Sequence, residues 1–188
     1  MYDAWKVAIL GLDGVGKTAL AVRFTLDCFV YSYDPTTEEV GTRKQLVLDN
    51  RMCYVELIDT AGQEEHATLR DQWVREGQGF ILVYSIDSRD SFEKVGAFRE
   101  SVRRAKEGDP IFVLVGNKAD ALHGRQVSKE EGVALAQQFG CEFVEVSAKT
   151  GQNVEWAFTS VLRALRKEQT RNLGPGERER KKGRCIIL

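Results

Sequence analysis

Short runs of apolar residues alternate with amphipathic stretches along most of the chain. Continuous apolar runs of this length are typical of strands that are covered on both faces in a parallel sheet. The runs of this kind are residues 5–11, 79–86, 110–116 and 142–147. Residues 42–49 and 51–59 form two further strand-like runs. The turn-forming pair Asp49-Asn50 lies between these two runs, which predicts an antiparallel hairpin.

Amphipathic segments lie between the apolar runs and predict helices. Residues 128–140 begin with Ser128 and Glu131 in capping-box spacing and stop at a glycine, as helices often do. The other helical segments are residues 17–26, 91–107 and 153–169, and one more is expected between residues 59 and 79. The order β-α-β-β-α-β-α-β-α-β-α predicts an α/β, doubly wound, six-stranded and mostly parallel sheet with one antiparallel edge strand and five helices.

Length and composition favour one domain followed by a tail. The chain has 188 residues with 43% hydrophobic content, enough for one sizeable core, and we expect that domain over residues 1–170. From residue 171 to 188 glycine, proline and charge replace the apolar period, which is typical of a flexible polybasic tail. The 27 basic and 28 acidic residues nearly balance, so overall charge does not favour a nucleic-acid partner.

The cysteines indicate reduced thiols. Cys28, Cys53, Cys141 and Cys185 form no C-x-x-C pair and have no metal-ligand spacing, which is typical of a cytosolic protein. We expect the first three to be buried structural thiols, and we expect Trp156 to pack a helix against the sheet. Neither an N-terminal signal sequence nor an apolar run approaching the ~20 residues of a membrane span is visible.

The segment from Gly11 to Thr18 fits the phosphate-binding template G-x-x-x-x-G-K-[ST]. It follows a predicted strand and opens a predicted helix, which is the context that this template requires. Its backbone N–H groups can surround phosphates, Lys17 can reach the β and γ oxygens, and the Thr18 hydroxyl can ligate Mg²⁺. The residues expected at the phosphates are Asp13, Gly14, Val15, Gly16, Lys17, Thr18 and Ala19.

Two segments at the ends of later strands predict a guanine site. Residues 116–120 read GNKAD, and Asp120 can accept paired hydrogen bonds from N1–H and the exocyclic amine of guanine, a donor pair that adenine lacks. Residues 146–149 read VSAK and can supply a backbone donor to the guanine O6. The residues expected at the base are Asn117, Lys118, Asp120, Ser147, Ala148 and Lys149.

With these motifs in place, residues 5–170 resemble the Ras branch of small GTPases, which implies the small G-protein form of the P-loop NTPase fold. Phe29 resembles the aromatic residue beside guanine in this family. The segment containing Tyr33, Pro35 and Thr36 resembles switch I, whose Thr36 would ligate Mg²⁺ when the γ-phosphate is present.

Residues 59–65, DTAGQEE, resemble switch II of the same family. The resemblance implies that Asp59 holds a Mg²⁺-bound water, that the Gly62 N–H contacts the γ-phosphate and that Gln63 orients the attacking water. Gln63, Lys17 and Gly62 are therefore the expected catalytic residues. In this family the loss of one phosphate releases both switch loops.

Asp13 departs from the family pattern, which usually has glycine at this position. At an effective dielectric near 20, two unit charges about 4 Å apart repel by roughly 4 kcal/mol, so we expect the Asp13 carboxylate to turn away from the γ-phosphate. Turned away, it still fills the space through which the arginine finger of an activating protein would enter. We predict slow hydrolysis and a weak response to activators; the alternative is a solvent-facing Asp13 with ordinary turnover.

A second departure follows switch I. Thr37 and Glu39 replace the usual Ile and Asp, and the segment is one residue longer before Arg43. An extra residue in an edge strand predicts a bulge, with Gly41 as its site. Effector recognition by strand addition along this edge is compatible with the pattern, but the effectors of well-known relatives do not transfer automatically.

The last four residues, CIIL, fit the C-a-a-X prenylation motif, and the final leucine favours geranylgeranylation of Cys185. A single lipid holds a membrane weakly, so the basic residues just upstream would add attraction to anionic lipids. We therefore expect the protein at the cytoplasmic face of the plasma membrane or of other endomembranes.

These features together predict a membrane-tethered, Mg²⁺-dependent, monomeric switch that binds GTP or GDP and hydrolyses GTP. Its expected partners are an exchange factor, a GTPase-activating protein and effectors at both switches. One alternative is a persistently GTP-loaded scaffold with negligible turnover. Another is a P-loop nucleoside phosphotransferase, which would need an arginine-bearing lid and an acceptor site.

Overall fold

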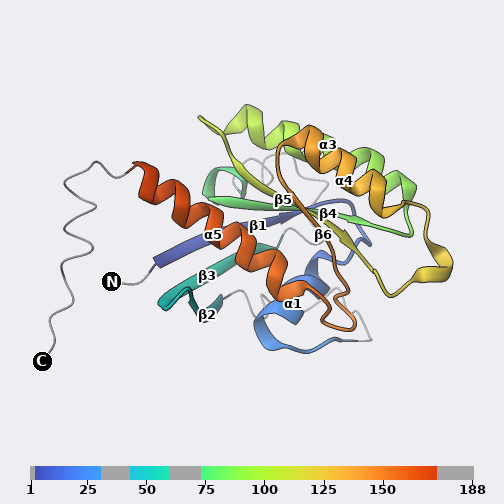
Figure 1. Ribbon diagram of the computed structural model, residues 1–188, viewed down its shortest axis with the longest axis horizontal. Coiled ribbons are helices and arrows are strands. Elements are labelled where there is room, and N and C mark those ends of the chain that lie inside the picture. The colour runs from blue at the N-terminus through green and yellow to red at the C-terminus, as the bar shows by residue number, and fades with distance from the viewer. Residues whose placement is uncertain (1–2, 31–42, 60–72, 173–188) are drawn as a thin grey trace, which may run out of the picture.

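A six-stranded sheet forms the centre of the molecule, in the order β2-β3-β1-β4-β5-β6 (Figure 1). The computed structural model describes residues 3–30, 43–59 and 73–172. The strands are β1 (Asp3–Leu10), β2 (Arg43–Leu48), β3 (Arg51–Asp59), β4 (Gly79–Ser85), β5 (Ile111–Asn117) and β6 (Glu142–Glu145). Strand β2 runs antiparallel to β3 and every other neighbouring pair is parallel, which confirms the predicted mixed sheet.

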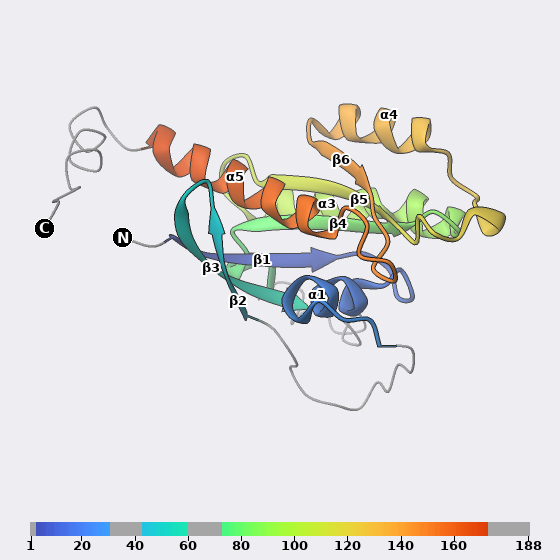
Figure 2. The ribbon, with the colours of Figure 1, turned by 60° about the horizontal axis from the view of Figure 1, so that its bottom comes forward.

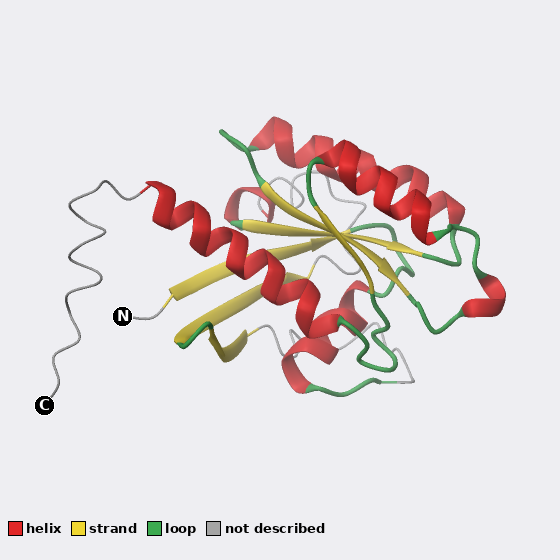
Figure 3. Cartoon of the chain, in the orientation of Figure 1, coloured by secondary structure: helices red, strands yellow, loops and turns green. Residues whose placement is uncertain are grey.

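Helices cover both faces of this sheet (Figure 3). The α-helices described are α1 (Lys17–Leu26), α3 (Arg89–Ala105), α4 (Lys129–Phe139) and α5 (Val154–Asn172), and a short 3₁₀ helix, η1, spans Leu122–Gly124. Residues 73–76 are also helical. The rest of the fifth helix predicted between residues 59 and 79 falls outside the described residues.

Each strand of the parallel region contributes to two cores. In β1, Val7 and Ile9 belong to the core under α1 and α5, whereas Ala8 and Leu10 belong to the core under α3 and α4. All four are nearly or fully buried, which explains why this strand is a continuous apolar run rather than an alternating one.

The core under α1 and α5 is built around aromatic stacking. Phe24 of α1 and Phe158 of α5 have ring centroids 4.0 Å apart and are nearly parallel. The apolar face predicted for α5 is buried as expected, and its members are Val154, Ala157, Phe158, Val161, Leu162 and Leu165. Helix α1, which opens with the phosphate-binding residues, is therefore held by packing against α5.

The local signals in the sequence give the expected turns and caps. Asp49 and Asn50 both have positive φ, 48° and 61°, as a two-residue hairpin of type I′ requires. Ser128 and Glu131 form a complete capping box at the start of α4, and Gly140 ends that helix with φ 69°. The β2–β3 hairpin and α4 are thus confirmed with boundaries within two residues of those predicted.

The parallel strands deliver their carboxyl ends to one end of the sheet, where β1 leads into α1 (Figure 2). The start of β1 and the end of α5 lie at the opposite end in both views. There Arg166 of α5 donates from Nε to Asp3 at 2.7 Å and from Nη1 to the Leu48 carbonyl at 2.8 Å. None of the helices in the described ranges combines the length and apolar character that a membrane span needs.

Two side-chain predictions were wrong. Cys28 is exposed, because it lies in the loop beyond the end of α1, whereas Cys53 is buried and burial raises the pKa of its thiol. Cys141 is only partly buried. Trp156 is 42% exposed, because it lies about 200° around α5 from the buried Val154 and so misses the apolar face.

Candidate functional site

The loop between β1 and α1 has a conformation that depends on glycine. Gly16 has φ 92°, and a Cβ built on it would lie 2.5 Å from Nδ2 of Asn117. A Cβ on Gly11 would collide with the carbonyl of Val83 in β4. Both positions therefore need a residue without a side chain, which is why the loop can lie so close to β4 and β5.

The first turn of α1 offers backbone donors to an anion. Its N-cap is Gly16, which makes no side-chain capping bond, and its first turn contains no acidic residue. Uncapped N–H groups and the positive end of the helix dipole favour a phosphate at this place. Thr18 and Ala19 belong to this turn, as predicted.

Lys17 lies across the loop it follows. Its side chain is only 3% exposed, and its Nζ donates to the carbonyls of Gly11 and Leu12 at 2.8 and 2.9 Å. The ammonium group is therefore held directly above the loop that would receive the phosphates. This is the position from which it can contact phosphate oxygens.

Asp13 lies at the outer edge of the same loop. Its side chain is 75% exposed, yet its Oδ1 is 3.8 Å from Nζ of Lys17. The carboxylate thus points to solvent and pairs with Lys17, the residue predicted to bind phosphate, and this contact was not predicted from the sequence. Its orientation toward a bound γ-phosphate stays a prediction.

Asn117 joins the phosphate loop to the predicted guanine loop. Its side chain is 2% exposed at the end of β5. Nδ2 donates to the carbonyl of Val15 at 2.8 Å, and Oδ1 accepts from the backbone N–H of Ala148 at 3.2 Å. One buried amide therefore holds both loops in place.

Asp120 and Ser147 meet at the mouth of this site. The Ser147 hydroxyl is buried and donates to Oδ1 of Asp120 at 2.6 Å, and it accepts from the N–H of Thr150 at 3.0 Å. Asp120 itself is exposed, as is Lys149, so the carboxylate is held by Ser147 and remains accessible from solvent. Phe29 is partly buried and packs against the core beside α1.

Two residues near the predicted base site, Asp87 and Arg23, were not predicted from the sequence. Lys118, with φ 64°, places Nζ 3.3 Å from Oδ2 of Asp87, and Asp87 also accepts a short hydrogen bond from the buried Ser85 hydroxyl. Arg23 of α1 donates to the carbonyls of Ala148 and Lys149. Neither Asp87 nor Arg23 belongs to a recognised motif, and only tertiary structure brings them to the site.

Several predicted site residues lie outside the described residues. They are Tyr33, Pro35, Thr36, Gly62, Gln63 and Cys185, together with the predicted bulge at Gly41. Asp59 ends β3 beside Ile9 of β1, so its backbone reaches the edge of the phosphate loop. Among the described residues there is no cluster of three or more His, Cys, Asp or Glu residues that could hold a metal by themselves.

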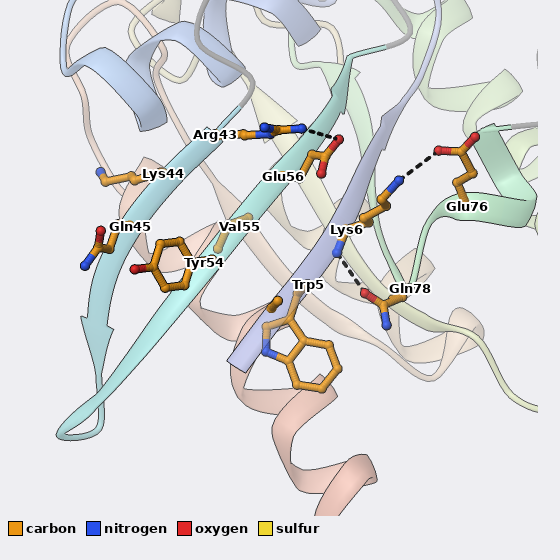
Figure 4. Close-up of a pocket in the computed structure, with 11 residues that line it drawn as sticks. Trp5, Lys6, Arg43, Lys44, Gln45, Tyr54, Val55, Glu56, Glu76 and Gln78 are labelled. Carbon is orange, nitrogen blue, oxygen red and sulfur yellow. Dashed lines mark hydrogen bonds and ion pairs between the residues drawn. The ribbon is translucent and has the colours of Figure 1, made fainter. Parts of the chain in front are cut away.

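A groove of about 870 Å³ lies elsewhere, on the outer face of β1, β2 and β3 (Figure 4). Four of its charged side chains form two ion pairs: Lys6 contacts Glu76 at 3.1 Å and Arg43 contacts Glu56 at 3.6 Å. The groove is lined by side chains of β1, β2 and β3 together with Glu76 and Gln78, which precede β4, and not by the N-terminus of a helix. The features that suit phosphate and guanine therefore lie at the carboxyl ends of the strands and not in this groove.

The fold and this site define a small GTPase. The family model described as "Ras family" matches residues 6–167. The chain is 49% identical to "Ras-like protein 1" of Pyricularia oryzae, over 87% of this chain and 76% of that protein. It is 41% identical to "Protein ras-2" of Neurospora crassa, over 98% of this chain and 96% of that protein, and 45% identical to "Ras-like protein B" of Aspergillus fumigatus, over 94% and 84%.

The chain belongs to the Ras family. Proteins of this family are GTP hydrolases that bind GTP and GDP and act as switches with regulators and effectors. The resemblance inferred from the P-loop, GNKAD and VSAK segments is thereby confirmed. The expected five-helix, six-stranded small G-protein fold agrees with this membership.

Proposed function

We propose that this GTPase is a Mg²⁺-dependent switch that acts from a membrane surface and whose turnover is slowed by Asp13. The buried amide of Asn117 carries the nucleotide part of the proposal, because it joins the phosphate loop to the VSAK loop. A nucleotide that spans from one loop to the other would contact both of the elements that this side chain aligns.

Guanine selectivity is assigned to Asp120. The Ser147 hydroxyl donates to one carboxylate oxygen, which leaves acceptor capacity for the two ring-edge donors of guanine. Replacing Asp120 with Asn should weaken GDP binding and improve binding of xanthosine diphosphate, whose 2-oxo group can accept from the new amide. Equal GDP affinity in Asp120→Asn and the native protein, measured by fluorescence titration, would contradict this assignment.

The oxygen donors present suit Mg²⁺. Thr18 is the second residue of α1, and Asp59 ends the neighbouring strand β3, which supports a position for both beside the expected phosphates. Thr18 and Thr36 would hold the ion, and Asp59 would hold it through water. The ion would neutralise phosphate charge, Lys17 would stabilise the β and γ oxygens, the Gly62 N–H would contact the γ-phosphate, and Gln63 would orient the attacking water.

Asp13 gives the second candidate function, a switch that stays loaded with GTP. Its exposed carboxylate occupies the outer edge of the loop and lies within ion-pair range of Lys17. From there it competes for the ammonium group that should stabilise the transferring phosphoryl group, and it obstructs an activator's arginine. Both effects slow hydrolysis without preventing binding.

Single-turnover hydrolysis of preloaded GTP tests whether Asp13 slows turnover. The native protein and Asp13→Gly are compared with and without a Ras-type activating protein at saturating Mg²⁺. If only the glycine variant responds to the activator, by a factor on the order of 10³ or more, Asp13 is a brake. If both variants respond equally, the protein is an ordinary cycling switch.

The membrane part of the proposal depends on Cys185. A geranylgeranyl group on this residue, beside the basic residues of the tail, would supply the two signals needed for stable attachment. Cys185→Ser should move the protein from the membrane to the soluble fraction of cells. Unchanged fractionation would contradict lipid anchoring while leaving the nucleotide chemistry untouched.

A further inference from the structure

Arg23 connects the helix after the phosphate loop to the loop after β6. Its Nε donates to the Ala148 carbonyl at 2.9 Å and its Nη2 donates to the Lys149 carbonyl at 2.6 Å. Nη1 donates to the Asp27 carbonyl at 3.1 Å, and only 15% of the side chain is exposed. All three of these donors therefore bond to backbone carbonyls, and the Ala148 carbonyl is 125 positions away from Arg23 in the sequence.

The two carbonyls belong to successive peptide units, and holding them sets the direction of the N–H groups beside them. In a trans peptide the carbonyl and the following N–H point in opposite directions, and no cis peptide occurs in the described ranges. The Ala148 carbonyl points to Arg23, so the Lys149 N–H points away from α1. The Lys149 carbonyl also points to Arg23, so the Thr150 N–H points the other way.

The Thr150 N–H is connected through hydrogen bonds to the Asp120 carboxylate, which is proposed to bind guanine. The Thr150 N–H donates to Oγ of Ser147 at 3.0 Å, and that hydroxyl donates to Oδ1 of Asp120 at 2.6 Å. A continuous chain of hydrogen bonds and peptide planes thus runs from Arg23 to Asp120. Loosening its first member should let the carboxylate rotate away from its present direction.

Arginine suits this role better than other residues. The planar guanidinium presents donors in a rigid fork that can serve two neighbouring carbonyls at once, whereas a lysine ammonium is a flexible point charge. Hydrogen bonds from a charged donor are also stronger than neutral ones. Arg23 lies six positions after Lys17 on α1, so the fork ties the phosphate-binding helix directly to the base loop.

We propose that Arg23 is a positioning residue that holds the loop of residues 147–151 in its guanine-reading conformation and so sets how fast guanine nucleotide leaves. The inference rests on the proposed role of Asp120 in reading guanine. Arg23 would then be a second link between the phosphate and guanine halves of the site, besides the link made by Asn117. We expect it to affect discrimination between bases as well as nucleotide affinity.

The test measures dissociation of GDP and of inosine diphosphate from the full-length protein in excess Mg²⁺. Inosine diphosphate lacks the exocyclic amine that Asp120 would accept, so the ratio of the two rates reports how well the carboxylate is placed. Arg23→Gln should raise the GDP dissociation rate on the order of tenfold, the worth of one charge-assisted hydrogen bond, and should bring the two rates closer together. Arg23→Lys should fall between Arg23→Gln and the native protein.

Asp27→Asn is the matched control. Asp27 is 94% exposed and pairs with Arg23 at 3.7 Å, but within the described part of the chain its side chain does not contact the loop of residues 147–151, and asparagine tolerates its positive φ of 53°. Since exposed ion pairs contribute little, this variant should release GDP within about twofold of the native rate. Thermal melting of each variant in saturating GDP records any general loss of stability.

Two outcomes would overturn the proposal. One is an unchanged GDP dissociation rate in both Arg23→Gln and Arg23→Lys. The other is an equal acceleration of GDP and inosine diphosphate, which would make Arg23 a residue of fold stability alone. If the native protein released GDP and inosine diphosphate at the same rate, Asp120 would not bind the exocyclic amine of guanine. That result would contradict the proposed function, and it can be seen before any Arg23 variant is made.

Discussion

The guanine half and the phosphate half of the nucleotide site are built in different ways. The phosphate half is local: Lys17 donates to carbonyls five and six residues away, and the loop depends on backbone conformations at glycine. The guanine half is assembled from distant segments, because Asn117 reaches Val15 across 102 positions and Arg23 reaches Ala148 across 125. Backbone conformation therefore determines the structure of the phosphate half, and long-range side-chain hydrogen bonds determine the structure of the guanine half.

This difference implies that the two halves should fail differently. A change in the phosphate loop acts through strain at one backbone position, so its effect should depend on φ and on the space around a new Cβ. A change in the guanine half leaves a buried partner without its hydrogen bond, so its effect should depend on burial.

Gly16→Ala should damage both halves at once. The strain of φ 92° costs about 2 kcal/mol, and displacement of the Asn117 amide from its 2.5 Å approach costs about 2 kcal/mol more. GDP affinity should then fall on the order of 10³-fold, measured by titration calorimetry. Gly14→Ala is the matched control, because it has φ 75° but no atom within 4 Å of the added Cβ. Equal losses in both variants would show that strain alone, and not the contact with Asn117, is responsible.

Asn117→Ala tests the buried side-chain link between the two halves. It removes the partners of the Val15 carbonyl and the Ala148 N–H, both buried, at a cost of roughly 2 to 3 kcal/mol. GDP release should accelerate on the order of 10²-fold in a stopped-flow exchange assay. Asn117→Asp keeps the acceptor for Ala148 but loses the donor to Val15. If it releases GDP as slowly as the native protein, the link to the phosphate loop is not what matters.

Asp87→Asn should have a smaller effect, because the pair it weakens is partly exposed. Lys118 and Asp87 have side chains that are 38% and 29% exposed, so their interaction is expected to contribute about 0.5 to 1 kcal/mol. GDP release should therefore accelerate about two- to fivefold, and less at high salt. A rate that is independent of ionic strength would indicate that Ser85, rather than the charge on Lys118, is the important partner of Asp87.

Tyr84→Phe lies outside both halves and should leave nucleotide release unchanged. Within the described part of the chain the Tyr84 hydroxyl is fully buried without a hydrogen-bond partner, and burial raises the pKa of this phenol. Removing an unpaired buried hydroxyl should stabilise the fold by about 1 kcal/mol. Urea unfolding measures this gain. A destabilised variant would show that the hydroxyl contributes through packing against α4.

The sequence predicted the local features of the molecule well. Apolar runs gave the strands, the Asp49-Asn50 pair gave the hairpin, and Ser128 with Glu131 gave the start of α4, because each signal acts over a few residues. The phosphate loop could also be recognised from the sequence, because it corresponds to a short contiguous motif.

The sequence did not predict contacts between distant segments. Nothing near Arg23 in the chain indicates that it meets the carbonyl of Ala148, and nothing near Asp87 indicates a partner in Lys118. The ion pair of Asp13 with Lys17 does not follow from the motif, because the sequence pattern places both residues beside a phosphate rather than in contact with each other. Exposure of Cys28 depended on where α1 ends relative to the core, which periodicity does not define to the residue.

Arg166 joins α5 to both the first residue of β1 and the β2–β3 turn, through Asp3, the Leu48 carbonyl and Asp49. Asp3 and Arg166 are therefore in contact, and the start of β1 and the end of α5 lie at the end of the sheet farthest from the carboxyl ends of the strands (Figure 1). A short linker between them would permit circular permutation, with new termini opened in a surface loop. A fluorescent fusion partner attached beside Asp3 would likewise sit away from the nucleotide and report on the protein without blocking exchange.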